Sequence, residues 1–424
     1  MNKLNNLLIY EVYIRNHTKE GTFKGFINDL DRIKSLGVDY IWFMPIHAIS
    51  QVNKKGSLGC PYAIKDFKSI NPEYGTKEDF QLLIDAIHKR DMKVMIDIVF
   101  NHTGYNSNYY KENKDFFYKN KFGNISNKVG DWYDIIDLDY SNKDLWKKQI
   151  EVLKYWSNFG VDGYRCDVAP LIPIDFWIEA RKAVEKINPE TLWLAETVHP
   201  HFLLELRHKG FIAHSDCETY QAFDLTYDYD VDLDIKKYLK GEIPLERYLE
   251  KLRMQEYIYP KNYVKMRFLE NHDVPRGAKL IPHYKKLKQW TAFKYFEKGA
   301  MLLYAGQEAL DTNLPSLFDK DLVNWDHMKD DFTNFLIRLK EIKSDSLLDD
   351  GIYTIHETNS DIIYLSYKTD QRLKIGIFNL TLFDQSLKVD IPDGNYNNLI
   401  DNSTITISNN EIHLSEEPII FEVI

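Results

Sequence analysis

Ionisable residues lie within or directly after several strand-like apolar segments of this 424-residue chain. The segment "DGYRCDV" (162–168) places Arg165 and Asp167 two residues apart, so a β-strand would direct both charges to the same face. Asp97 lies in "KVMIDIVFNH", Glu196 ends "LWLAE", and Asp273 ends "LENHD". Carboxyl groups in such different surroundings suit acid–base chemistry in which one group is ionised and another keeps its proton.

Two carboxyl groups about 5 Å apart, with different pKa values, are what retaining glycoside hydrolysis requires. We expect Arg165 to keep the pKa of Asp167 low, and desolvation behind "LWLA" to raise the pKa of Glu196. Each carboxylate alone has a simpler interpretation as a helix N-cap or a solvated loop residue, and each histidine as a core residue. Their joint position at strand ends favours chemistry, because the strand ends of a barrel meet at one mouth.

Seven apolar runs and one weaker run predict the strands that would carry these residues. The seven are 7–14, 39–45, 93–100, 162–168, 192–196, 265–270 and 301–306, and the weaker one falls at 211–216 or 221–225. They are apolar on both faces, as expected for parallel strands covered by helices. Helical patterns fall between them at 77–90, 144–159 and 174–187. Eight strands with intervening helices predict a (β/α)8 barrel, although the pattern alone also allows a doubly wound open sheet.

Two segments interrupt the alternation of strands and helices. Residues 102–141 are too long for an ordinary loop, so we expect a small excursion subdomain over the barrel mouth. From about residue 346, short alternating runs separated by Asp, Asn, Gly and Pro predict a C-terminal antiparallel β-sandwich. The expected domains are the barrel (1–101 and 142–345), the excursion (102–141) and the sandwich (346–424).

Composition narrows the classes of partner. The net charge of −10 argues against nucleic acid or an anionic membrane as the main partner. The three cysteines lack metal-ligand spacing, and their odd number favours a reducing compartment. We see no apolar run near 18 residues and no signal-peptide pattern at the start, which predicts a cytoplasmic protein without a membrane segment.

Four short segments resemble the conserved regions of the α-amylase family, glycoside hydrolase family 13. In chain order these are "DIVFNH", "GYRCDVA", "ETV" and "ENHD", and "IWFMPI", "YAIKDFKSINPEYGT" and "YAGQE" are also similar to family segments. The likeness spans residues 8 to about 310. It implies the same barrel and an enzyme that acts on α-glucans.

The resemblance also implies roles for individual residues. Asp167 would be the nucleophile, Glu196 the general acid/base, and Asp273 the third carboxylate, which stabilises the transition state. Six further residues would surround or support the sugar being cleaved: Tyr62, Asp97, His102, Arg165, His272 and Arg276. Trp132, Tyr133, Phe116 and Phe117 are either sugar platforms or local packing.

The chain also departs from the family pattern. Many relatives carry a histidine shortly after the nucleophile, where this chain has Ala169-Pro170-Leu171, so its leaving-group preference is open. Asn101 and Asp139 match positions that supply calcium ligands in some members, which makes a structural calcium possible. Two ligands do not establish a site that needs six or more oxygens. No cofactor motif is present, and we expect none to be required.

We therefore predict a retaining hydrolase of α-1,4-glucosidic bonds in maltooligosaccharides or starch-type glucans. A transglycosylase or phosphorylase of the same family is the nearest alternative, because it would share the covalent intermediate. A non-catalytic carbohydrate-binding protein on the same fold is the alternative from another class. Chain-length preference, endo or exo action and oligomeric state are not predicted.

Overall fold

The computed structural model describes residues 4–358 and 360–423. Its centre is a closed barrel of eight parallel strands in the order β1-β12-β11-β10-β9-β8-β5-β2. The strands are β1 (Leu8–Val12), β2 (Tyr40–Phe43), β5 (Lys93–Ile98), β8 (Gly163–Cys166), β9 (Leu192–Ala195), β10 (Leu225–Tyr227), β11 (Lys265–Arg267) and β12 (Ala300–Tyr304). The predicted (β/α)8 barrel is confirmed.

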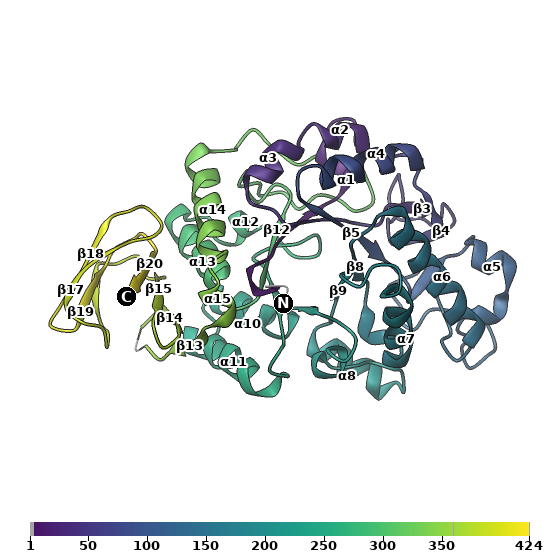
Figure 1. The fold of residues 1–424 in the computed structure, drawn as a ribbon. Coiled ribbons are helices and arrows are strands. Elements are labelled where there is room, and N and C mark those ends of the chain that lie inside the picture. The colour runs from purple at the N-terminus through teal and green to yellow at the C-terminus, as the bar shows by residue number, and fades with distance from the viewer. Residues whose placement is uncertain (1–3, 359, 424) are drawn as a thin grey trace.

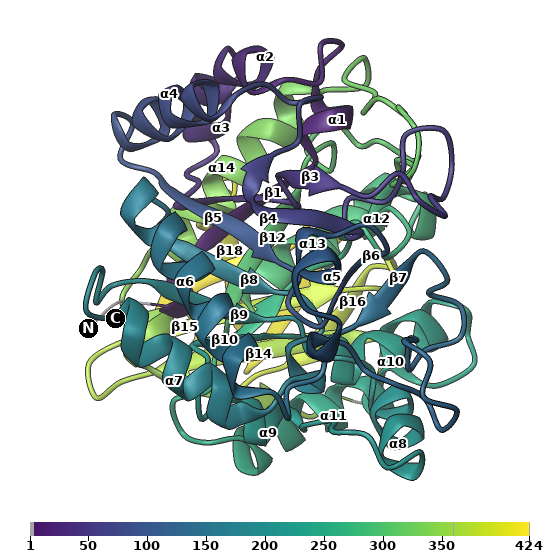
Figure 2. The same ribbon diagram turned by 90° about the vertical axis from the view of Figure 1, so that its right-hand side faces the viewer.

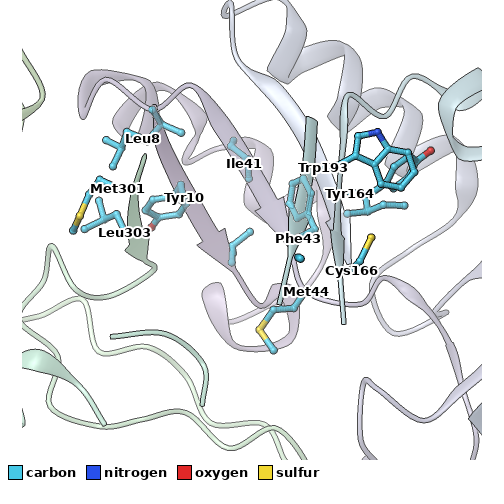
Figure 3. Close-up of a cluster of buried hydrophobic side chains, with 14 of the residues drawn as sticks. Leu8, Tyr10, Ile41, Phe43, Met44, Tyr164, Cys166, Trp193, Met301 and Leu303 are labelled. Atoms are coloured by element: carbon cyan, nitrogen blue, oxygen red, sulfur yellow. The ribbon is translucent and has the colours of Figure 1, made fainter. Parts of the chain in front are cut away.

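Side chains alternate along each barrel strand between two separate cores. Leu8, Tyr10, Tyr164 and Cys166 point outward and pack under the surrounding helices, as Figure 3 shows. Ile9 belongs instead to the smaller cluster inside the barrel. Because side chains in a strand alternate with period two, Arg165 must point inward when Tyr164 and Cys166 point outward.

Helices surround the barrel, as Figure 2 shows from the end where α5 lies. They are α1 (Ile14–His17), α2 (Phe23–Ile27), α3 (Leu30–Ser35), α4 (Lys77–His88), α6 (Lys143–Phe159), α7 (Ile174–Val184), α8 (Pro200–His208), α9 (Asp216–Thr219), α10 (Tyr229–Leu239), α11 (Leu245–Ile258), α12 (Gly277–Leu280), α13 (Tyr284–Phe296), α14 (Asp330–Lys343) and α15 (Leu347–Asp350). Helix α4 begins with a capping box between Thr76 and Asp79. Helix α6 is followed by Gly160 as its C-cap. The φ of 106° at this position lies in the left-handed region, which favours glycine.

The weakest strand prediction needs correction. Residues 211–216 form no strand and lead instead into α9. The strand at this place in the barrel is β10, which begins only at Leu225, the last residue of the second predicted range. Its three residues give too short an apolar run to be found from sequence periodicity alone.

Two excursions lie at the carboxyl ends of the barrel strands. The predicted one contains β6 (His102–Gly104), α5 (Asn108–Glu112), a 3-10 turn at Lys114–Phe116 and β7 (Ile135–Asp137). The other was not predicted: β3 (His47–Ile49) and β4 (Ile64–Ile70) form a hairpin after β2. The connection between β3 and β4, residues 50–63, carries Tyr62.

The C-terminal domain lies at the opposite side of the molecule from α5, beside α13 and α14 (Figure 1). One sheet contains β13 (Ile352–His356), β14 (Ile362–Lys368), β15 (Leu373–Asn379) and β20 (Ile419–Val423). The other contains β16 (Gln385–Lys388), β19 (Glu411–Leu414), β18 (Thr404–Ser408) and β17 (Gly394–Asn397). Ile375, Ile412 and Phe421 belong to their shared core, which confirms the predicted antiparallel sandwich.

Candidate active site

Strand register brings the predicted catalytic carboxylates together. Asp97 on β5 pairs with Arg165 on β8, and Cys166 pairs with Ala195 on β9. Asp167 and Glu196 are each one residue beyond that last pair. The amide N–H of Asp167 donates to the Ile98 carbonyl, and the amide N–H of Glu196 donates to the Cys166 carbonyl. The two side chains therefore enter the barrel mouth from adjacent strands.

The guanidinium of Arg165 contacts three carboxylates and is fully buried. Its Nη1 donates to Asp97 Oδ1 at 2.9 Å and to Asp167 Oδ1 at 2.8 Å, and its Nη2 lies 2.9 Å from Glu196 Oε1. Its Nε donates to the Tyr227 hydroxyl at 3.1 Å. One buried cation thus holds both predicted catalytic carboxylates and the supporting Asp97 in a single cluster.

A polar chain continues from this cluster across the barrel. The Tyr62 hydroxyl donates to Asp97 Oδ2 at 3.1 Å and lies 2.8 Å from His272 Nε2. The ring of His272 stacks on that of Tyr62, and its Nδ1 contacts Glu11 Oε1 on β1. Burial lowers the pKa of His272, but Asp273 and Glu11 raise it to about 9. His272 is therefore protonated at neutral pH, with both ring nitrogens as donors.

A pocket of about 180 Å³ opens above this network. Its lining residues are Lys55, Cys60, Tyr62, His102, Trp132, Asp134, Ile135, Asp167, Val168, Glu196, His272, Asp273, Leu317 and Phe318. The side chain of Asp273 is 43% exposed, with Oδ2 3.2 Å from His272 Nε2. Since all three predicted catalytic carboxylates, both histidines and Tyr62 line this pocket, it is the candidate site.

A larger cavity in the described part of the chain lies elsewhere. It measures about 880 Å³ and is lined by Leu192 and Val264, at the amino ends of the barrel strands. The three predicted catalytic carboxylates are not among its lining residues. Size alone would therefore select the wrong end of the barrel.

The electrostatic prediction for Asp167 is wrong. Burial raises its pKa to about 7, although Arg165 opposes this shift. Burial likewise raises the pKa of Glu196 to about 7, as predicted. Desolvation of Asp167 outweighs a cation that is itself shared among three carboxylates. At neutral pH the two catalytic groups therefore compete for about one proton.

Because of these raised pKa values, the ionised site carries a cost in folding free energy. The pKa of Asp167 is about 7 in the folded protein and about 4 in an unfolded chain. The folded protein thus holds more protons between these values, and its stability falls as the pH rises from about 4 to 7. We expect Asp167→Asn to be more stable than wild type by at least about 1 kcal/mol at pH 8, with no gain at pH 4.

Urea unfolding at both pH values measures this difference. Asp31→Asn is the matched control, because Asp31 is exposed and Arg90 lowers its pKa, which is the opposite shift. A stability gain of Asp167→Asn that is equal at pH 4 and pH 8 would contradict the burial argument.

Arg276 was predicted to contact substrate, and the structure places it elsewhere. Its guanidinium is fully buried and donates to Glu270 at 2.7 Å, the Ala305 carbonyl at 2.9 Å and the Asn313 carbonyl at 3.0 Å. Arg276 does not line the pocket. It joins the segment after β11 to the loop after β12, which is a structural role. Its nearness to "NHD" in the sequence did not distinguish this role from a substrate contact.

The two positions predicted to bind calcium have different hydrogen-bond partners. The Asn101 amide donates to Asp137 Oδ1 at 3.1 Å, whereas Asp139 Oδ1 accepts the Ser141 amide at 3.0 Å. Within the described ranges, no group of three or more His, Cys, Asp or Glu residues is arranged to hold a metal ion. The two side chains thus have separate partners, and calcium binding stays a prediction.

The segment where relatives often have a histidine forms a short 3-10 turn at Ala169–Leu171. It follows Val168, whose φ of 38° is left-handed and strained for a β-branched residue. This conformation directs the Val168 amide N–H to Glu196 Oε2 at 2.7 Å. The wall beside Glu196 is therefore apolar. A leaving group would meet apolar side chains there instead of an imidazole.

Several residues that line the pocket or support it from behind were not found from the sequence. Glu11 stands alone in the apolar strand "LIYEV", the same signal that marked Arg165 and Asp167, and was overlooked. Lys55 and Phe318 lie in irregular loops far apart in the chain and carry no periodic signal. Among the candidate platforms, Trp132 lines the pocket, whereas Phe116 and Phe117 are buried in the core.

Comparison with known proteins agrees with this geometry. The family model "Alpha amylase, catalytic domain" matches residues 14–136 and 130–346. The chain belongs to the α-amylase family. A second model, "Bacterial Alpha amylase C-terminal domain", matches residues 354–421. The resemblance seen in the short motifs therefore extends over the barrel and the sandwich.

Solved members of the α-amylase family share the whole fold. The crystal structure of an alpha-amylase from Lactobacillus plantarum is 43% identical, covers 100% of both chains and has a TM-score of 0.97. That of a noncanonic maltogenic alpha-amylase from Thermotoga neapolitana is 31% identical, covers 100% of this chain and 99% of the other, and has a TM-score of 0.89.

Curated relatives in the family are longer. Alpha-amylase MalA of Haloarcula japonica is 27% identical over 350 residues, which span 80% of this chain and 48% of that protein. The intracellular maltogenic amylase of Bacillus subtilis is 26% identical, over 85% of this chain and 62% of that protein. The chain thus spans about half to two thirds of the length of these two relatives.

Proposed function

We propose that this protein is a retaining glycoside hydrolase that cleaves α-1,4-glucosidic bonds in maltooligosaccharides and starch-type glucans. The observation that carries the proposal is the cluster in which one buried guanidinium contacts both Asp167 and Glu196. One cation bridging two carboxylates suits the short separation that a covalent glycosyl intermediate requires. The names of the relatives, alpha-amylases and maltogenic amylases, support the class of substrate.

The hydrogen bond from Arg165 supports different protonation states for the two carboxyls. Arg165 donates a hydrogen bond to Asp167, which stabilises the anion. Its contact with Glu196 is an ion pair without a directed hydrogen bond. We therefore assign the shared proton to Glu196 and the negative charge to Asp167.

The reaction then has two steps. Asp167 attacks the anomeric carbon as Glu196 protonates the leaving oxygen, and the glycosidic bond breaks. Glu196, now a carboxylate, removes a proton from water, which displaces Asp167 and releases the sugar with its configuration retained. Asp273 and the protonated His272 lie at the pocket wall, where they would bind the hydroxyls of the reacting ring.

The remaining proposals concern the cofactor requirement and the cellular location of the protein. We propose that no cofactor is required, since the mechanism of two carboxyl groups needs no other chemical group. We also propose a cytoplasmic location, supported by three free thiols and by the intracellular relative. None of the helices in the described part of the chain has the length and apolar character to cross a bilayer.

A product time course on maltooligosaccharides, starch, pullulan and sucrose, run in EDTA, tests the proposal. We expect hydrolysis of the α-1,4-linked substrates, with α-anomers seen first by NMR. Faster turnover on addition of phosphate or an acceptor sugar would instead indicate a phosphorylase or transglycosylase. Binding without turnover on every substrate would contradict catalysis.

A further inference from the structure

Lys55 joins three loops at one wall of the pocket. Its Nζ lies 2.8 Å from Asp134 Oδ1 in the excursion after β5, and both residues line the pocket. The same ammonium lies 4.9 Å from the ring centre of Tyr133 and 5.8 Å from that of Phe318. Lys55 thus connects residues 50–63, the excursion and the loop after β12.

Further contacts hold these loops in place beside Lys55. The Leu58 amide donates to the Phe318 carbonyl at 3.0 Å, and the Ser57 amide and hydroxyl donate to Asp319 Oδ1 at 2.8 and 2.6 Å. Gly56 has φ 61°, and a Cβ there would lie 2.5 Å from the Cβ of Phe318. The loops therefore pack closely against each other. Lys55 and Phe318 form a wall of packed side chains there, not an open groove.

The wall and the proposed acid border different apolar clusters. Phe318 packs with Cys60 and Ile135 in one small apolar cluster. Val168, which donates to Glu196, belongs to a different cluster with Leu171 and Val198. Trp132 packs against both clusters and spans the distance between them. The leaving group would depart beside Glu196. The wall with Lys55 would then face the non-reducing side of the bound ring.

We propose that the Lys55–Asp134 pair closes the pocket behind a single sugar ring and makes the enzyme act on non-reducing chain ends. This inference rests on the proposed function. The pocket volume of about 180 Å³ is below the 300 Å³ or more of sites for drug-sized ligands. A pocket of this size holds about one sugar ring, so a closed end would admit only the terminal ring of a chain. Attack by Asp167 and then water would release one glucose per cycle.

Two maltoheptaosides with the same chromophore at the reducing end, whose shortened products are separated by chromatography, test this proposal. One has a free non-reducing end, and the other carries a 4,6-O-ethylidene group there. We expect wild type to cleave the free substrate at least about 100-fold faster, because the blocked terminal ring cannot enter the pocket. Lys55→Ala should raise cleavage of the blocked substrate at least about tenfold by opening the wall.

Phe318→Ala is a second variant that opens the same wall. Lys54→Ala is the matched control, since Lys54 is exposed and its Nζ bonds only the nearby Ser57 carbonyl; it should leave the ratio of the two rates unchanged. Equal cleavage of both substrates by wild type would overturn the closed end. If wild type is selective but both folded variants stay inactive on the blocked substrate, the assignment to Lys55 is wrong. No cleavage of either substrate would count against the proposed function.

Discussion

Asp167→Asn is expected to lower kcat on maltooligosaccharides by at least about 1,000-fold. An amide is a poor nucleophile for the anomeric carbon, and the other carboxylates of the site have their own partners, Arg165 or His272. Glu196→Gln should cause a loss of similar size on substrates with a sugar leaving group, because the leaving oxygen then has no proton donor.

The two variants differ in how they respond to the leaving group. A glycosyl fluoride needs no proton to depart, so Glu196→Gln should recover the first step with it, whereas Asp167→Asn should not. Burst kinetics on the fluoride measures this difference. Glu190→Gln, an exposed carboxylate at the opposite end of the barrel, is the control. Near wild-type turnover by either catalytic variant would refute its assigned role.

Arg165→Met is expected to lower the free energy of unfolding by about 3–5 kcal/mol at pH 8. The substitution leaves Asp97, Asp167 and Glu196 buried without their cation. Their pKa values are already raised to about 6, 7 and 7, and losing Arg165 raises them further. The folded variant therefore binds more protons than the unfolded chain, so its deficit should shrink as the pH falls to 5.

Urea unfolding of Arg165→Met at pH 5 and pH 8 tests this expectation. Adding Asp97→Asn should restore part of the stability at pH 8, because it removes one of the uncompensated charges. Arg181→Met provides a control, since Arg181 is partly exposed and pairs mainly with Asp224; its cost should be about 1 kcal/mol or less. A deficit of Arg165→Met that does not change with pH would contradict the electrostatic origin.

Local patterns in the chain were sufficient for the fold and for the chemical groups of the site. The strand "DGYRCDV" combines outward apolar residues with inward Arg165 and Asp167, and period two determines this alternation before any tertiary contact forms. The stripe and capping box of α4 are likewise local. Four strands that end in ionisable residues therefore indicated both the barrel and its catalytic mouth.

Other features depend on distances between segments that no local pattern encodes. Arg276 lies three residues after Asp273, yet packing directs it to Glu270 and the loop after β12. The pKa of Asp167 was misjudged because its value depends on how deeply the folded barrel buries the carboxyl group itself. Strand β10 was nearly missed because the barrel, rather than the periodicity of its own residues, positions it.

The chemistry of this protein is thus readable in its sequence, because inward side chains at strand ends follow from backbone geometry alone. The shape of the pocket depends on tertiary structure. Lys55, Asp134 and Phe318 come from three irregular loops, and only the folded barrel brings them to one wall. The predicted catalytic groups are specified by strand position, whereas the shape of the pocket around them depends on how those loops pack against one another.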